Sequence, residues 1–226
     1  MSANLPNHPT LYVDGISSIS ETGLRPHIIT GIFLQLIREH FINADRIDSP
    51  YLKTLLWVHK EGDPVTPDPA RSKILIDPVY RWNLKETQRR PAVLVKRNEM
   101  QPQNIGLAHS RTFGLGDRDF PEAGSKHSLF FVGSHTFFCV ATDGGAVETL
   151  STEVARHLYQ FAPIITREFC FLTLEIAQIG EVTVLEESSE HFTVPIVMRY
   201  SYEDKWLLTK QEPRFKGVSV EIGTGE

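Results

Sequence analysis

Residues 128–142 read SLFFVGSHTFFCVAT, and this stretch decides the fold class because it is a long β-like run. Apolar side chains occupy both alternating sets of positions, and the polar interruption is confined to Ser134, His135 and Thr136. A strand that is apolar on both faces has to be covered on both faces, by a helix, another sheet or another subunit. We predict one long strand, or a strand pair, with Gly133 as a bulge or bend.

Amphipathic helices are predicted on both sides of this stretch. The first covers Pro26–Asn43, because Pro26 suits a first helical turn and apolar residues follow at helical spacing. The second covers Ala146–Phe161 and follows the turn Asp143-Gly144-Gly145, with Pro163 as its expected end or kink. The side chains expected on the polar sides of the two helices are Gln35, Arg38, Glu39, His40, Glu148, Glu153, Arg156 and Gln160.

Shorter β-like runs complete the pattern. They cover Lys73–Ile76, Pro91–Arg97, Phe169–Ile179, Thr183–Leu185 and Phe192–Tyr202. Pro195 predicts an edge position or a bulge in the last of them. Tyr51–His59 is compatible with a strand or a short helix. The order of helix, loop, strands, helix and strands predicts an α+β fold, a mainly antiparallel sheet with two helices packed on one face and long loop insertions.

The predicted organisation is a single domain over residues 26–205. Residues 1–25 form an extended N-terminal arm, and residues 206–226 form a C-terminal strand or tail in which Trp206–Leu208 and Val218–Ile222 are β-like. Two insertions interrupt the domain, at about 60–90 and 98–125. Four prolines in the first insertion argue against a regular helix or an inner strand there. Insertions of this length are usually functional or contact a partner.

Composition excludes several classes of protein. The 226 residues include 23 Lys and Arg against 28 Asp and Glu, a net charge of −5, which excludes a strongly basic protein that coats nucleic acid. Hydrophobic residues make up 41% of the chain, as in folded globular proteins. Two cysteines, Cys139 and Cys170, cannot form a disulfide-rich scaffold, and we expect both to be buried. We expect no signal peptide and no membrane-spanning segment.

Sites for phosphate or metal ions are not indicated. Gly114-Leu115-Gly116 is an isolated G-x-G in a loop and favours a turn. His127 and His135 would stand about 26 Å apart on a straight strand, too far to share an ion. Asp117-Arg118-Asp119 could hold a divalent cation, but a solvated loop with an internal ion pair is the favoured interpretation.

Nucleophilic catalysis is not indicated either. Cys139 and His135 would lie about 13 Å apart on one strand face, beyond a hydrogen bond. Ser134 and Ser151 lack the G-x-S-x-G context of a nucleophile elbow. We therefore expect no enzymatic activity and assign no catalytic, cofactor-binding or metal-binding residue.

Recognition of nucleic acid has one weak candidate. Arg81-Trp82 and Gln88-Arg89-Arg90 place a ring near cations in the first insertion. Trp and Arg are also favoured in protein interfaces, so a protein contact is the preferred interpretation for Trp82. The charges are expected on a solvated face.

The order of these elements resembles that of the tail-terminator and neck proteins of long-tailed bacteriophages. The resemblance rests on the helix Pro26–Asn43, the run Arg90–Val95, the strand Leu129–Val140, the helix Ala146–Phe161 and the strands up to Tyr202. It implies an antiparallel sheet with two helices on one face, assembled into a six-fold ring. In such a ring, copies of the chain would cover the apolar stretch 128–142.

The resemblance implies a structural protein of the virion neck, assembled in the host cytoplasm. It would stop polymerisation of the tail tube and present a face to the head-side connector or stopper protein. DNA would pass through the lumen without sequence-specific contacts, and no membrane would be involved. Glu186, Glu187 and Glu190 are candidates for a lumen or tube-facing loop, and a solvated hairpin tip explains them equally well.

Two alternatives remain open on the sequence. The first is another head-completion or collar protein that shares the assembly but not the contact with the tube. The second is a hydrolase or ligand-binding domain, for which a deep pocket with convergent polar groups would be expected.

Overall fold

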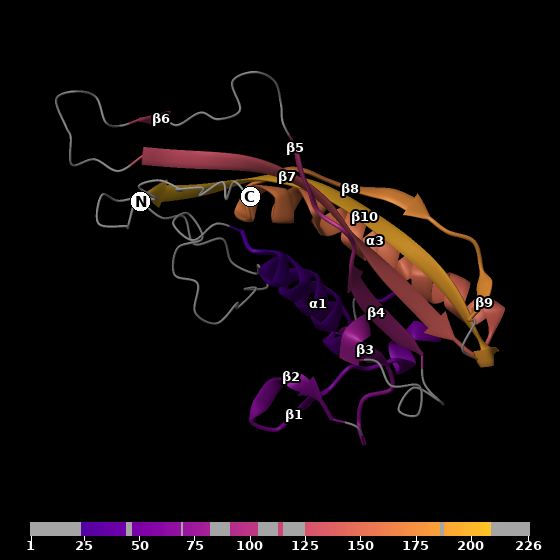
Figure 1. Cartoon of the computed structure of the whole chain (residues 1–226). Coiled ribbons are helices and arrows are strands. Elements are labelled where there is room, and N and C mark those ends of the chain that lie inside the picture. The colour runs from indigo at the N-terminus through magenta and orange to yellow at the C-terminus, as the bar shows by residue number, and fades with distance from the viewer. Residues whose placement is uncertain are drawn as a thin grey trace, which may run out of the picture.

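The computed structural model describes residues 24–43, 47–68, 70–81, 91–103, 113–114, 125–185 and 188–208. The predicted N-terminal arm up to residue 23 lies outside these ranges, as does the predicted strand Val218–Ile222. Within them the chain has an α+β fold, in which two helices lie on one side of a mainly antiparallel sheet (Figure 1).

The main sheet has the order β3-β4-β7-β10-β8. In that order the strands span Leu75–Pro78, Ala92–Arg97, Ser125–Ala141, Ser188–Leu208 and Phe171–Ile179. The pair β3–β4 is parallel, and the other pairs are antiparallel. Three short strands extend the sheet: β5 (Gln101–Gln103) and β6 (Phe113–Gly114) pair with β7, and β9 (Thr183–Leu185) pairs with β10.

The segment between the first helix and β4 contains short elements. Leu52–Thr54 forms the 3₁₀ turn η2, and Val79–Arg81 forms η3. A small hairpin joins β1 (His59–Lys60) to β2 (Asp63–Pro67). The ambiguous stretch Tyr51–His59 thus contains the short 3₁₀ helix η2, then residues 55–58 outside any helix or strand, and ends at the first residue of β1. The strand predicted over Lys73–Ile76 begins two residues later, as β3.

The centre of the sheet is the pair β7–β10. Its register runs without a shift from Phe192 opposite Ala141 to Leu208 opposite Ser125. The predicted stretch is thus one long strand, and the prediction of a bulge at Gly133 is wrong. Gly133 lies opposite Tyr200, and a Cβ built on it would be 2.9 Å from Tyr200 Oη and 2.8 Å from Met100 Cγ. Because Gly133 has no side chain, the Tyr200 ring can occupy the space beside its backbone.

The first helix, α1 (Pro26–Ile42), confirms the prediction. Pro26 occupies its first turn, and Ile29, Ile32, Phe33 and Ile37 are fully buried. The assignment of its polar side is partly wrong, because Arg38 and His40 are buried as well.

The second helix, α3 (Gly144–Glu168), begins two residues before the predicted start at Ala146, and the Asp143 side chain accepts a hydrogen bond from the Ala146 N–H at 2.8 Å. The predicted end at Phe161 is wrong, because Pro163 lies inside the helix. Pro163 has no N–H, so the carbonyl of Tyr159, four residues earlier, lacks its usual helical hydrogen bond. Tyr159 is 74% exposed, and water can therefore donate to this carbonyl instead. Ile165 is fully buried beyond the proline and holds the helix on the core.

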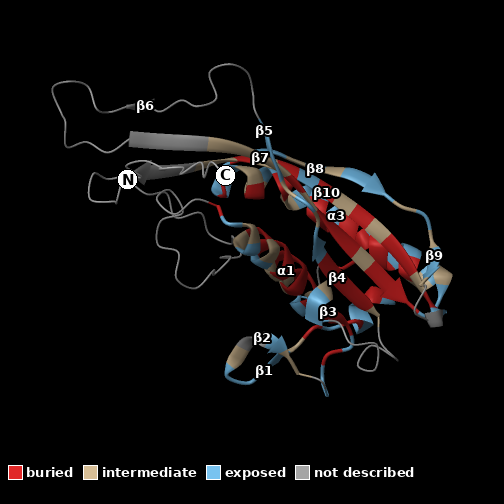
Figure 2. Cartoon of the chain, viewed as in Figure 1, coloured by how far each residue is buried: buried red, intermediate tan, exposed pale blue. Residues whose placement is uncertain are grey.

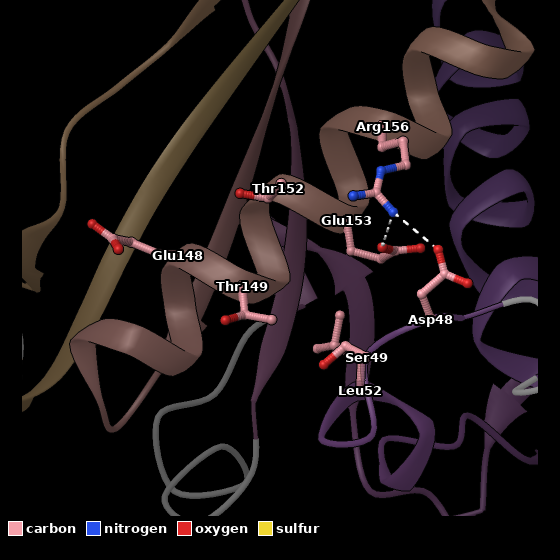
Figure 3. A pocket seen from close by; sticks show the side chains of 8 residues that line it. All are labelled: Asp48, Ser49, Leu52, Glu148, Thr149, Thr152, Glu153 and Arg156. Atoms are coloured by element: carbon pink, nitrogen blue, oxygen red, sulfur yellow. Dashed lines mark hydrogen bonds and ion pairs between the residues drawn. The ribbon is translucent and has the colours of Figure 1, made fainter.

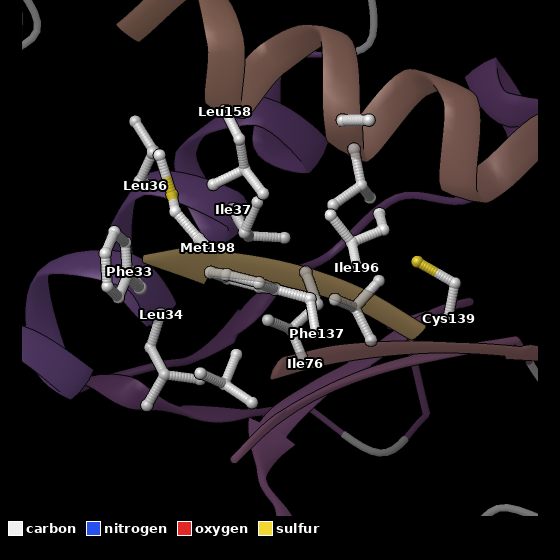
Figure 4. Packing of buried hydrophobic residues seen from close by; sticks show 14 of the residues in the cluster. Phe33, Leu34, Leu36, Ile37, Ile76, Phe137, Cys139, Leu158, Ile196 and Met198 are labelled. Atoms are coloured by element: carbon white, nitrogen blue, oxygen red, sulfur yellow. The ribbon is translucent and has the colours of Figure 1, made fainter. Parts of the chain in front are cut away.

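The core lies mainly between the helices and the sheet (Figures 2 and 4). On this face β7 contributes Phe137 and Cys139, and β10 contributes Ile196 and Met198. A smaller cluster lies on the other face and comprises Leu75, Ala92, Leu94 and Val140, with Val79 and Phe138 against it. Phe137, Cys139 and Val140 are each at most 1% exposed in the single chain. These three positions need no cover from a second copy, whereas residues 129–132, Ser134 and Phe138 of the same strand are half-buried in the single chain.

Pro195 lies in an inner strand, so the predicted edge position is wrong. Its carbonyl accepts the Gly180 N–H at 2.7 Å, in the gap between β8 and β9. In extended backbone the N and the C=O of one residue point to the same side, so the Pro195 nitrogen also faces this gap. The missing N–H of the proline therefore falls where neither β8 nor β9 pairs with β10. The neighbouring pairing is irregular at Val197 and Met198, in line with the predicted bulge.

Replacement of Gly133 tests the close contact in the central pair. We expect Gly133→Ala to lower the free energy of unfolding by about 1–3 kcal/mol, because the new methyl group displaces the Tyr200 ring. Gly31→Ala is the matched control, since a Cβ at this exposed helical position meets no atom within 4 Å. It should raise stability by about 0.5–1 kcal/mol. Urea unfolding measures both, and a neutral Gly133→Ala would contradict the contact.

Candidate assembly surface

The outer edge of β8 is open in the described part of the chain. β8 pairs with β10 from Phe171 opposite Tyr202 to Ile179 opposite Ile196, and no described strand pairs with its other side. Leu172 and Ile179 at its two ends are 53% and 54% exposed. An edge strand presents unpaired N–H and C=O groups, so these nine residues offer a template for a further strand.

Irregular pairing shapes this edge. The register between β8 and β10 shifts at two places, which leaves Leu172 and Ala177 without direct partners in β10. Such bulges bend and twist a strand, and they limit unspecific pairing at its edge. The sequence of β8, FLTLEIAQI, carries no Lys, Arg or Pro, and its one charge is Glu175. A partner strand would have to follow the bend.

The two faces of β8 differ in polarity. Leu174 and Ile176 are half-buried and pack against the core cluster under the helices. Thr173 and Glu175 are exposed, and the Thr173 hydroxyl lies 2.7 Å from that of Ser201 on β10. The open edge therefore separates an apolar side from a polar side.

The opposite edge of the sheet is closed by side chains. Arg38 of α1 donates to the carbonyl of Ile76 in β3 from Nε at 3.2 Å and from Nη2 at 3.0 Å. Its Nη2 also donates to Asp77 Oδ1 at 2.9 Å, and its guanidinium lies over the Trp57 ring at 5.1 Å. Burial lowers the pKa of Arg38, and the Asp77 carboxylate opposes that effect. Because β3 is short and ends at Pro78, it offers little for a further strand.

A pocket of about 530 Å³ lies between α3 and the segment before η2 (Figure 3). Its lining residues are Asp48, Ser49, Leu52, Glu148, Thr149, Thr152, Glu153 and Arg156. Arg156 Nη1 bridges Asp48 Oδ2 at 3.5 Å and Glu153 Oε2 at 3.4 Å. Glu153 Oε1 lies 3.0 Å from His40 Nε2. Burial raises the pKa of Glu153, and the charge of Arg156 opposes that rise.

This pocket is an ion-paired groove. The Thr149 hydroxyl donates to the Gly145 carbonyl of its own helix at 2.8 Å. Across the described residues, no three His, Cys, Asp or Glu side chains are grouped so that they could hold a metal ion. The sequence placed Glu153 on a polar helix side, whereas the structure buries it against His40 of α1. No local sequence pattern predicts the contact between His40 and Glu153, because the two residues are 113 positions apart.

The predicted nucleophile candidates are not brought together with a base. Cys139 is fully buried, which raises the pKa of its thiol, and it lies opposite Val194, whereas His135 lies opposite Met198. Asn98 Nδ2 donates to the Ser134 hydroxyl at 3.0 Å. The Ser151 hydroxyl donates to the Glu148 carbonyl at 3.0 Å. Cys170 is exposed, so the expectation that both cysteines are buried is wrong for this residue.

Several residues singled out in the sequence have other outcomes. Arg81 and Glu190 are exposed, and Gly114 lies in β6. The candidates outside the described residues, or whose side chains lie outside them, are Trp82, Gln88, Arg89, Arg90, Gly116, Asp117, Asp119, His127, Glu186 and Glu187. The acidic lumen loop thus stays a prediction.

His135 is a buried polar residue within the core. Its side chain is packed between Phe33 and Tyr200, and Nε2 lies 2.8 Å from the Thr30 hydroxyl. That hydroxyl also donates to the Pro26 carbonyl at 3.2 Å, so the consistent arrangement has the histidine Nε2–H donating to Thr30. Burial lowers the pKa of His135 to about 3, and the nearby Arg97 charge adds to this effect.

No protein-family model matches the chain, and no curated protein matches it. A search of the described helices for one long and apolar enough to cross a bilayer finds none.

The lowered pKa of the buried His135 should make the stability of the fold depend on pH. The unfolded chain takes up a proton at His135 near pH 6.5, whereas the folded chain does so near pH 3. The free energy of unfolding should therefore fall as the pH drops from about 6.5 towards 3, by up to about 1.4 kcal/mol per pH unit. His135→Gln should flatten this slope.

The measurement is urea unfolding at pH 7 and pH 5. His59→Gln is the control, because His59 is exposed, and it should keep the slope of the wild type. Equal slopes for the wild type and His135→Gln would contradict the assignment.

Proposed function

We propose that this chain is a structural subunit of a bacteriophage neck, a tail terminator that forms a ring, caps the tail tube and joins it to the head-side connector. The observation that carries the proposal is the open edge of β8, a nine-residue strand with exposed apolar side chains at both ends. The element order that resembles the tail-terminator family is its second support.

The two flanks of the sheet are unlike, and this favours contact between unlike surfaces. Arg38 closes the flank at β3, whereas the flank at β8 is open. When one surface of a subunit contacts a different surface of the next, the assembly closes into a ring if the rotation permits. In a closed ring, the open β8 edge of every copy is covered by a neighbouring copy. The six-fold stoichiometry follows from the resemblance.

The proposed role is mechanical. Asp48 and Glu153 of the pocket are paired with Arg156, and Glu153 also with His40, and we propose no catalysis, cofactor or metal for this site. The proposed partners are copies of the chain, the tail-tube protein and the head-side connector or stopper protein. A net charge of −5 suits a lumen through which DNA passes without sticking.

Ring formation and capping test this function. We expect the purified chain, alone or on its template, to give a closed oligomer by native mass spectrometry and a ring by electron microscopy. Added to polymerising tail-tube subunits, it should stop growth and bind the tube end. Binding to connector subunits without binding to the tube would favour another head-completion or collar protein, and a monomer that binds neither would contradict the proposal.

Charged substitutions at the open edge test whether β8 takes part in assembly. Leu172→Lys and Ile179→Lys should abolish ring formation, because each places a desolvated charge in the contact. The monomer should keep its stability within about 0.5 kcal/mol, since both positions are over half exposed. Tyr159→Lys, at a 74% exposed site on α3, is the control. Assembly that persists in both edge variants would contradict the role of β8.

A further inference from the structure

We propose that residues 218–222 of one copy add as a strand to the open edge of β8 in the next copy. The inference rests on the proposed assembly and names its contact. β8 lacks a partner on its outer side among the described strands. The segment 218–222, VSVEI, is the one further β-like run beyond Leu208, where the description of the chain ends.

The side-chain pattern of this segment fits the two faces of β8. Apolar Val218, Val220 and Ile222 alternate with Ser219 and Glu221. Successive residues of a strand point to opposite faces, so one pairing puts the apolar set on the helix side and the polar set on the other. The helix side of β8 presents the half-buried Leu174 and Ile176.

An antiparallel register that also suits the charges can be specified. With Ser219 opposite Glu175, Val218 lies opposite Ile176 and Val220 opposite Leu174. Ile222 then reaches the exposed Leu172. The register keeps Glu221 from standing directly opposite Glu175, which would place like charges in one cross-strand pair.

The direction of β10 favours donation to a neighbour. Tyr202 pairs with Phe171 at the start of β8, and β10 then continues through residues 203–208, about 20 Å at 3.3 Å per residue. Figure 1 shows this end of the β7–β10 ribbon extending beyond α1. The C-terminal segment therefore starts away from its own β8. Donation to the next copy is a contact between unlike surfaces, as a ring requires.

Site-directed cross-linking of full-length chains tests the pairing. All variants carry Cys170→Ser, which removes the exposed thiol and leaves the buried Cys139. A tagged chain with Glu175→Cys is mixed with an untagged chain with Ser219→Cys, and a short bismaleimide is added. We expect a tagged–untagged dimer in about tenfold higher yield than with Lys53→Cys, an exposed position on η2, in place of Glu175→Cys.

A chain that carries both Glu175→Cys and Ser219→Cys separates the two origins of the strand. Bridging within single chains in dilute solution, without cross-linked dimers in the mixture, would overturn the proposal. Native mass spectrometry of the same samples reports on the ring. A ring without the cross-link would refute the donated strand and leave the proposed function standing, whereas a chain that stays monomeric and uncross-linked under every condition would refute both.

Discussion

The in-register pairing of β7 with β10 is the constraint on which the rest of the structure depends. Both strands are long, and their pairing passes through Gly133 and Tyr200 without a shift. A slip by one residue would move every apolar side chain to the wrong face. The pairing places Phe137 beside Ile196 and His135 beside Met198. These residues belong to the face of the sheet against which both helices pack.

From this centre the sheet grows in two chemically different directions. On one side β4 and β3 follow, and the Arg38 side chain ends the sheet by taking up the Ile76 carbonyl. On the other side β8 follows, and no described strand pairs with its outer side. A chain that buries Phe137, Cys139 and Val140 of its central strand by itself can still need a partner at its edge. The case for assembly therefore rests on the edge strand, not on the apolar middle.

The fold class was accessible from the sequence because periodicity reports burial directly. The helix from Pro26 and the long strand around Phe137 were predicted on that basis. The length of α3 was not, since the cost of Pro163 depends on whether the Tyr159 carbonyl can reach water, which is a tertiary fact. Val140 clusters with residues of β3 and β4, and no local pattern reveals the places of these strands in the sheet.

The candidate surface was less accessible than the fold. Nothing in the sequence shows that β8 is an edge strand, because strand order depends on non-local pairing. Arg38 and Glu153 look like surface charges at helical spacing, and their partners Asp77 and His40 lie far away in the chain. The separation of Cys139 from His135 could be estimated from the sequence, because the rise per residue along one strand is nearly constant.

Hydrogen exchange of the β8 amides, measured by mass spectrometry at low and high protein concentration, tests the central claim most directly. If the open edge joins copies, residues 171–179 gain protection as the concentration rises, while the amides of the β7–β10 centre stay protected throughout. Exchange in β8 that is the same at every concentration, across the range in which the oligomer forms, would contradict the account.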